Sequence, residues 1–124
     1  MSKLVENINL INIAAKNTKV VVPLQITKTI IQTLDILVEY NMIEYKILNK
    51  KAIVTLRYAS LKPTIKAINY MGGNYYNSIN HIYAKKELNT KKSLYIVRTS
   101  LGIMTLESAV KFKVGCTILF KITI

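Results

Sequence analysis

Hydrophobic residues in the first forty positions follow helical spacing twice, with a strand-like run between. Apolar residues recur every three or four positions over residues 3–15 and again over residues 27–40, which predicts two amphipathic helices. Residues 19–22 lie between them and are typical of a short buried strand that ends at Pro23. Asn41 suits the left-handed residue that closes a helix, so the second helix is expected to stop there.

A β-hairpin is predicted directly after the second helix. Apolar and polar residues alternate over residues 43–48 and again over residues 52–58, and Asn49-Lys50-Lys51 between them favours a turn. The first lobe is therefore expected to run α-β-α-β-β. Its two helices would cover one face of a three-stranded sheet.

The second half of the chain is dominated by strand-like segments. Strands are predicted at residues 64–70, 80–84, 93–98 and 117–123. Gly72-Gly73-Asn74 is typical of a loop, because glycine and asparagine favour turns over strands. The alternation in the last strand predicts two faces, with Ile118, Phe120 and Ile122 inward and Thr117, Leu119 and Lys121 on the opposite face.

A short helix is predicted just before the last strand, over residues 105–113. Thr105 is a good N-cap, and Glu107 in the first turn and Lys111 in the last turn both complement the helix dipole. Gly115 is expected to end the helix.

Together these elements predict an α+β fold of two small lobes. Residues 1–60 would form the N-terminal α-β-α-β-β lobe, and residues 61–124 a C-terminal lobe of mostly antiparallel strands with one short helix. Residues 59–63 are the only plausible linker. A chain of 124 residues has room for one domain or two small lobes.

The charge of the chain points to nucleic acid as its partner. Eighteen Lys and Arg residues against six Asp and Glu residues give a net charge of +12, spread over both halves. Basic groups that neutralise phosphates release condensed counterions, so a polyanion is the first partner to expect. A membrane partner is not expected. The apolar runs are too short to span a bilayer, and the first helix has too few charges for a membrane-surface helix.

Few residues in the chain are suited to catalysis or to metal binding. The six carboxylates are scattered, so no acid–base pair is predicted. His81 and Cys116 are the only histidine and the only cysteine, too few for a zinc site, and both are interpreted as ordinary strand residues. We therefore expect no enzymatic activity, no cofactor, no metal and no small-molecule substrate.

Two segments carry candidate RNA contacts. Tyr83 lies just before Lys85 and Lys86, where a ring can stack on an unpaired base while the lysines meet phosphates. The segment from Arg98 to Thr105 joins a strand to a helix. Its small hydroxyl residues and Gly102 offer hydrogen bonds and close backbone approach to phosphates and riboses.

The same segment resembles the C-terminal signature of bacterial-type small-subunit ribosomal protein eight. That family reads Ser-Thr-Ser-Lys-Gly-Val-Met-Thr-Asp, then a short helix, Gly-Gly-Glu and a closing strand. The positions in register here are Thr99, Ser100, Gly102, Met104, Thr105, Ala109 and Gly115. Upstream, His81-Ile82-Tyr83 is similar to the family's Arg-Ile-Tyr.

The resemblance implies two α/β lobes and binding to the central domain of small-subunit rRNA, chiefly through the C-terminal lobe. It also implies early assembly and contacts with neighbouring ribosomal proteins. Thr99, Ser100 and Gly102 would carry the family's RNA contacts. Leu101 replaces the signature's lysine, and Arg98 would supply the missing charge from another direction.

The expected function is thus that of a structural rRNA-binding protein of a small ribosomal subunit. The alternative is a basic RNA-binding or RNA-processing protein outside the ribosome. Ile, Asn, Lys and Tyr are abundant while Trp is absent and Arg occurs only at positions 57 and 98, which indicates A+T-rich coding. This favours a mitochondrial ribosome, with a plastid or the bacterial cytoplasm as alternatives.

Overall fold

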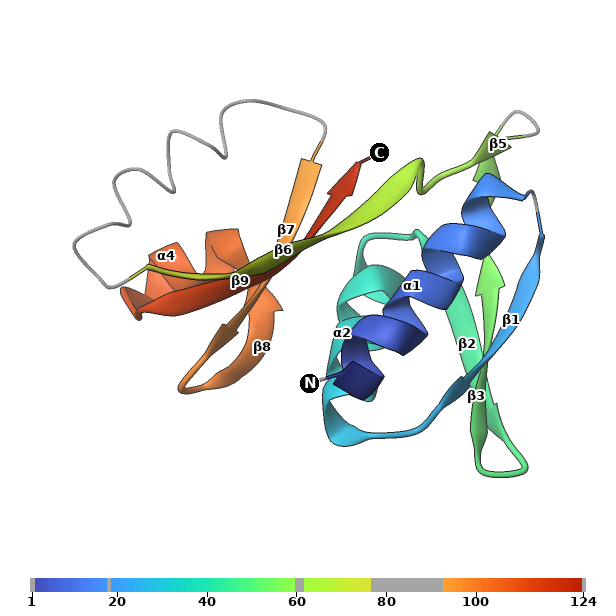
Figure 1. The fold of residues 1–124 in the computed structure, drawn as a ribbon, viewed down its shortest axis with the longest axis horizontal. Coiled ribbons are helices and arrows are strands. Elements are labelled where there is room, and N and C mark those ends of the chain that lie inside the picture. The colour runs from blue at the N-terminus through green and yellow to red at the C-terminus, as the bar shows by residue number, and fades with distance from the viewer. Residues whose placement is uncertain (1, 18, 60–61, 77–92, 124) are drawn as a thin grey trace. The chain divides into compact units, whose positions relative to one another are not determined.

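The computed structural model describes residues 2–17, 19–59, 62–76 and 93–123, and its helices lie where the sequence predicts them (Figure 1). The chain forms two units, residues 1–68 and 69–124. The first contains α1 (Ser2–Lys16), β1 (Val21–Gln25), α2 (Lys28–Glu39), β2 (Ile43–Leu48), β3 (Lys51–Leu56), β4 (Tyr58–Ala59) and β5 (Lys62–Pro63). Next come β6 (Ala67–Tyr76), β7 (Ser93–Thr99), β8 (Gly102–Thr105), α4 (Leu106–Phe112) and β9 (Cys116–Thr123).

The first unit is the expected pair of helices on one face of a three-stranded antiparallel sheet. The strand order is β1-β3-β2, and α1 and α2 lie on the same side of it (Figure 1). Alternate strand residues are buried against the helices. They are Val22, Leu24, Ala52, Val54 and Leu56, which meet a helical stripe that includes Ile8, Ile11, Ile30, Leu34 and Leu37. The α-β-α-β-β prediction is confirmed.

Local signals delimit α2 at both ends. The Thr27 Oγ accepts a hydrogen bond from the Ile30 N–H at 3.2 Å, which caps the first turn. At the other end Asn41 has a φ of 59°, and the Met42 N–H donates to the Leu37 carbonyl at 3.0 Å. Asn41 is therefore the left-handed residue that closes the helix, as the sequence indicates.

The strand expected at residues 19–22 instead begins at Val21 and continues through Pro23 to Gln25. The prediction that Pro23 ends it is wrong, because β1 is an edge strand. The Leu56 N–H donates to the Val20 carbonyl at 2.8 Å, and the alternation of antiparallel pairs then points the nitrogen of Pro23 away from β3. A missing N–H costs nothing at that position.

Two buried asparagines of α1 tie other segments of the first unit to this helix. The side-chain oxygen of Asn7 accepts from the Gln25 N–H at 3.0 Å, and that of Asn12 accepts from the Ile68 N–H at 2.9 Å. The second bond attaches the start of β6 to α1. The units meet between Ile68 and Asn69, within β6, whereas the sequence-based division lies at residue 60.

The second unit is a four-stranded sheet of order β6-β9-β7-β8 with α4 on one face (Figure 1). Six buried residues form the core between this face and the helix: Tyr95, Val97, Leu106, Ala109, Cys116 and Ile118. The expected mostly antiparallel lobe with a short helix is confirmed, although residues 80–84, where a strand was predicted, lie outside the described residues.

A β-bulge changes the faces predicted for the last strand. Ile96 pairs with Phe120 but Val97 pairs with Ile118, so Leu119 is an extra residue with no partner on β7. Ile118 therefore faces α4, while Phe120 faces the opposite side, where the Tyr70 ring lies 5.9 Å from its own. The prediction of a single inward face is wrong, and Leu119 is buried rather than outward-facing.

Two glycine predictions are also wrong. Gly72-Gly73-Asn74 lies inside β6 and forms no loop, because hydrogen bonding to β9 along the sheet outweighs the local preference of glycine for turns. The helix α4 ends at Phe112, and Lys113, with a φ of 55°, takes the left-handed position expected of Gly115. The Val114 N–H then donates to the Ala109 carbonyl at 3.2 Å.

Candidate nucleic-acid interface

The residues 99–102 form a tight hairpin turn between β7 and β8. Thr99 pairs with Gly102, which leaves Ser100 and Leu101 as the two exposed residues at the tip. The sequence predicts a direct strand-to-helix joint here, but β8 is inserted before α4 begins. The turn is thus held by strand pairing on both sides.

The hydroxyl of Thr99 fixes the shape of this turn from inside. Its Oγ accepts a hydrogen bond from the Leu101 N–H at 3.0 Å and donates to the Gly102 carbonyl, also at 3.0 Å. A threonine hydroxyl that bonds to the nearby main chain replaces a backbone hydrogen bond and so stabilises the turn. Thr99 therefore positions the turn, and Ser100 presents the exposed hydroxyl.

Gly102 satisfies a backbone requirement of the turn. Its φ is 117°, in the region that only glycine adopts without a steric penalty. The absence of a Cβ also lets another molecule approach the main chain closely at this point. Leu101, the exposed side chain between Ser100 and Gly102, is 62% exposed.

Arg98 and Cys116 flank the turn on opposite faces of the sheet. Arg98 is half-buried and pairs with Ile103 on β8 and with Thr117 on β9. Cys116 pairs with Thr99 and is buried in the core beside α4, where burial raises the pKa of its thiol above the ordinary value. Cys116 is thus a packed, protonated core residue, and Arg98 is the cation next to the turn.

Two further cations lie at the same end of the second unit. Lys111 and Lys113 are exposed at the C-terminal end of α4, and the chain then reaches Cys116, the partner of Thr99, within three residues. Glu107 is the one carboxylate among the described residues of this unit, and it lies at the opposite end of α4. The turn therefore lies in a positive local field. Neither lysine is among the RNA contacts predicted from the sequence, because their position beside the turn depends on the pairing of Cys116 with Thr99.

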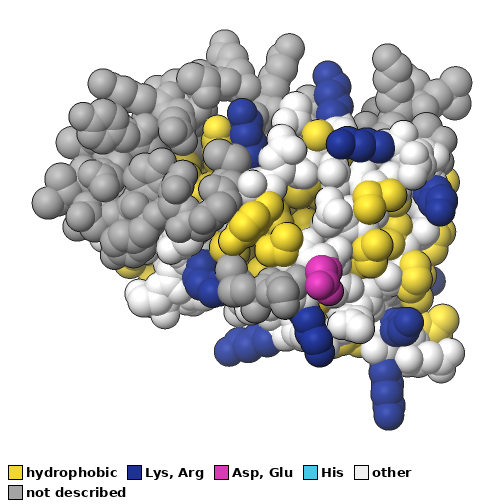
Figure 2. All heavy atoms as spheres, in the orientation of Figure 1, with side chains coloured by type: hydrophobic (Ala, Val, Ile, Leu, Met, Phe, Trp, Pro, Cys, Tyr) yellow, Lys and Arg dark blue, Asp and Glu magenta, His cyan; other side chains and the backbone are white. Residues whose placement is uncertain are grey.

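Tyr83, Lys85 and Lys86, which are the candidate contacts upstream of the turn, lie outside the described residues, as does His81. The structure brings together Arg98, Thr99, Ser100 and Gly102. Cationic side chains are spread over the face of the molecule seen in Figure 2, and acidic side chains are scarce on it.

Two carboxylates of the first unit, Asp35 and Glu44, contact neighbouring side chains. Glu44 lies 2.6 Å from the Arg57 guanidinium. Asp35 accepts a hydrogen bond from the Tyr45 hydroxyl at 2.6 Å, which raises the pKa of Tyr45 to about 12.

Among the described residues no group of three His, Cys, Asp or Glu side chains is placed to hold a metal ion. None of the described helices is long and apolar enough to cross a membrane.

Comparison with known proteins places this geometry in a family. No curated protein sequence matches the chain. The family model described as ribosomal protein S8 matches residues 3–123, which is nearly the whole chain and includes both lobes and the turn. The members are structural ribosomal proteins rather than enzymes. The chain therefore belongs to the ribosomal protein S8 family, and it is a small-subunit ribosomal protein that binds rRNA and contacts neighbouring ribosomal proteins.

Proposed function

We propose that this protein binds the central domain of the small-subunit rRNA through its C-terminal lobe, residues 61–124, and thereby supports subunit assembly and translation without catalysing a reaction. The observation that carries this proposal is the turn at residues 99–102. The Thr99 hydroxyl holds the shape of this turn, Ser100 presents an exposed hydroxyl, and Gly102 leaves the backbone open to close approach. The chain also belongs to a family that binds rRNA.

The turn suits recognition of folded RNA by shape. The wide, shallow groove of an RNA helix displays riboses and phosphates, and proteins read it mainly through hydroxyl and backbone contacts. Ser100 would donate or accept there, Gly102 would allow close approach, and Thr99 would keep both in place. Arg98, Lys111 and Lys113 would neutralise nearby phosphates.

We also propose that Tyr83, Lys85 and Lys86 contact the rRNA. A tyrosine ring stacks on an unpaired base whatever its identity, and adjacent lysines hold the phosphates on either side of that base. Replacing Tyr83 by Leu is expected to weaken binding to a fragment with an exposed base more than binding to an uninterrupted duplex.

We place the ribosome in a mitochondrion, with a plastid or a bacterial cytoplasm as the alternative. The support is compositional. The chain uses Lys for almost all of its positive charge and has Arg only at positions 57 and 98, as A+T-rich coding favours. Fractionation of cells that express the tagged protein tests this placement.

Sedimentation of native lysate tests the function itself. The protein should migrate with small ribosomal subunits at low magnesium, when the two subunits separate, and purified protein should bind a fragment from the central domain of the cognate rRNA. Migration away from both subunits, together with binding to other cellular RNAs, would favour an RNA-binding or RNA-processing role outside the ribosome.

A further inference from the structure

Phe112, the last residue of α4, is the most exposed large apolar side chain that the structure describes. It is 63% exposed, whereas Leu106 and Ala109 attach the same helix to the core. The ring therefore contributes little to the packing of α4. An aromatic ring in this position is available to a ligand, since both of its faces can serve for stacking.

The end of α4 holds the backbone of Phe112 in place without using its ring. The Lys113 N–H donates to the Val110 carbonyl at 3.1 Å. The Val114 N–H donates to the Ala109 carbonyl at 3.2 Å, which completes the pair of bonds that closes a helix around a left-handed residue. The apolar contact that accompanies this ending comes from Val114, which packs against the core. The ring thus extends from a fixed backbone and has no part in the cap.

The charged groups next to this ring are mainly positive. Lys111 and Lys113 are exposed directly before and after Phe112. Glu107, the one carboxylate among the described residues of this unit, lies in the first turn of α4, about 140° around the helix from Phe112. Cations therefore outnumber carboxylates around the ring. An aromatic ring between cations suits a nucleotide, whose base stacks on the ring while the flanking phosphates meet the cations.

The ring also lies at the same end of the second unit as the turn at residues 99–102. The strand β9 begins at Cys116, four residues after Phe112, and Cys116 pairs with Thr99 at the base of the turn. Leu101 at the tip of the turn is likewise exposed. RNA that is bound at the turn therefore passes close to Phe112.

We infer that Phe112 stacks on an unpaired base of the small-subunit rRNA, while Lys111 and Lys113 bind the phosphates beside that base. Every base has a face that an aromatic ring can cover, so the contact selects an unpaired nucleotide and not a sequence. The turn reads riboses and phosphates, which a continuous duplex also displays. Stacking by Phe112 would thus favour an irregular RNA helix over a continuous one. The inference rests on the proposed function and adds a base contact to it.

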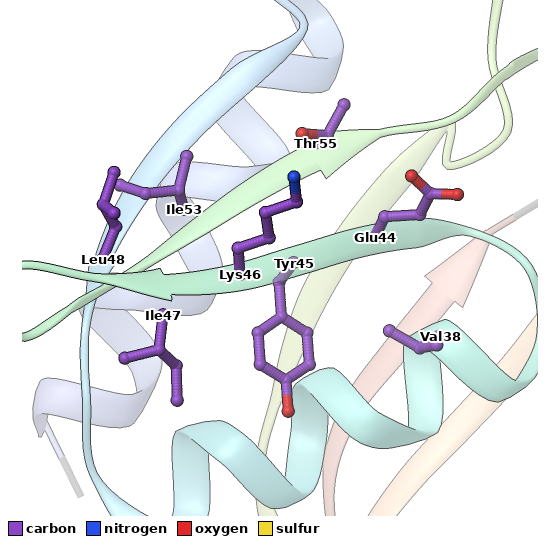
Figure 3. Close-up of a pocket in the computed structure, with 8 residues that line it drawn as sticks. All are labelled: Val38, Glu44, Tyr45, Lys46, Ile47, Leu48, Ile53 and Thr55. Carbon is purple, nitrogen blue, oxygen red and sulfur yellow. The ribbon is translucent and has the colours of Figure 1, made fainter.

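An exposed apolar side chain of the first unit provides a matched control. Ile47 on β2 is 59% exposed and lines an open hollow of about 560 Å³. Figure 3 shows Glu44 and Lys46 on the same strand, and they are the charged residues of the lining, one of each sign. This surface has no local excess of positive charge, and it lies outside the lobe that is proposed to bind RNA.

Substitutions of Phe112 test the stacking by affinity. Phe112→Leu keeps an apolar side chain but removes the ring, so affinity for a central-domain rRNA fragment with unpaired bases should fall roughly fivefold or more. Phe112→Tyr restores a ring and should recover the parent affinity to within about twofold. When the unpaired bases are deleted from the fragment, the parent and both variants should bind it alike. Their thermal midpoints should agree, because the ring is exposed.

Tryptophan fluorescence gives a direct readout, since the chain contains no Trp. The Phe112→Trp variant should lose most of its fluorescence when it binds the fragment with unpaired bases, because a stacked base quenches the indole. The Ile47→Trp variant is the control, and its fluorescence should stay the same on binding.

Equal affinity of Phe112→Leu and the parent for the fragment with unpaired bases would overturn the inference, as would unchanged fluorescence of Phe112→Trp. If Phe112→Leu binds RNA normally but enters small subunits less efficiently, the ring contacts a neighbouring protein, which also overturns it. A parent protein that binds neither fragment would refute the proposed function, and the inference with it.

Discussion

At the scale of single residues, the two hydroxyls of the turn have different tasks. The Thr99 hydroxyl makes two hydrogen bonds within the turn, whereas Ser100 is exposed at its tip. From the sequence alone, both hydroxyls are predicted to contact RNA in the same way. The hydrogen bonding assigns a positioning task to Thr99 and leaves Ser100 available to the ligand.

Single substitutions in the turn separate these tasks. Ser100→Ala should leave the free energy of unfolding within about 0.5 kcal/mol of the parent value and cost about 0.5–1.5 kcal/mol of RNA affinity, the net worth of one hydrogen bond. Thr99→Val keeps the shape of the side chain but removes both internal bonds, so it should lower stability by about 1–2 kcal/mol as well as affinity. Urea unfolding and rRNA-fragment titration on the same samples measure both. Full RNA affinity in Ser100→Ala would contradict the assignment.

Gly102 should be the least replaceable residue of the turn. Its φ of 117° costs a residue with a Cβ roughly 1–3 kcal/mol. Gly102→Ala is expected to lower the thermal midpoint and to weaken RNA binding beyond the effect of that destabilisation. Gly115→Ala is the matched control, since Gly115 does not have a positive φ. Similar losses in both variants would argue against a special backbone at residue 102.

At the scale of elements, Lys113 at the end of α4 has a strained backbone and carries a positive charge that RNA phosphates would attract. Lys113 occupies a left-handed conformation, which costs a non-glycine residue about 1–2 kcal/mol. Lys113→Gly relieves that cost but gives the unfolded chain about 0.4–1 kcal/mol of extra entropy. It should therefore stabilise the protein by about 0.5–1 kcal/mol.

The same Lys113→Gly substitution should weaken RNA binding. If Lys113 neutralises one phosphate, the slope of log affinity against log salt should flatten by about 0.7–0.9. Lys113→Asn removes the charge while tolerating the left-handed conformation, so it should reproduce the loss of affinity. Unchanged salt dependence in both variants would remove Lys113 from the proposed surface.

The link between α1 and β6 rests on a buried side-chain acceptor. Asn12→Ala leaves the Ile68 N–H without its partner, which should cost about 1–3 kcal/mol of stability, reduced by a few tenths through the better helix propensity of alanine. Lys16→Ala, at an exposed position of the same helix, should change stability by only a few tenths of a kcal/mol. Equal urea midpoints for the two variants would show that the hydrogen bond contributes nothing.

At the scale of the whole molecule, charge sets the class of partner. The net charge of +12 favours polyanions such as RNA. Affinity for the rRNA fragment should fall steeply as salt rises from about 50 to 200 mM, because each neutralised phosphate releases counterions. Filter binding at several salt concentrations, with duplex DNA of the same length as the control, measures this. Salt-insensitive binding, or equal affinity for the DNA, would contradict recognition of RNA shape.

Much of the fold could be predicted from the sequence because its signals are local. The N-cap Thr105, the left-handed Asn41 and the helical stripes depend only on residues within a turn or two of each other. The basic charge and the order of residues around Ser100 likewise require no tertiary contacts. They are sufficient to indicate an RNA-binding protein of two α/β lobes.

Only the tertiary structure decided the features that depend on which strand lies beside which. Pairing with β7 creates the bulge at Leu119, and pairing with β9 holds Gly72 and Gly73 in a strand. Because β1 is an edge strand, the missing N–H of Pro23 breaks no hydrogen bond of the sheet. Because β2 is the other edge strand, its outer N–H and C=O groups do not pair within the sheet. Hydrogen-bond register between distant segments is a non-local property, since residues far apart in the chain must meet before it exists. For the same reason, the hydrogen bonds of the Thr99 hydroxyl within the turn could not be predicted without the pairing of β7 with β8.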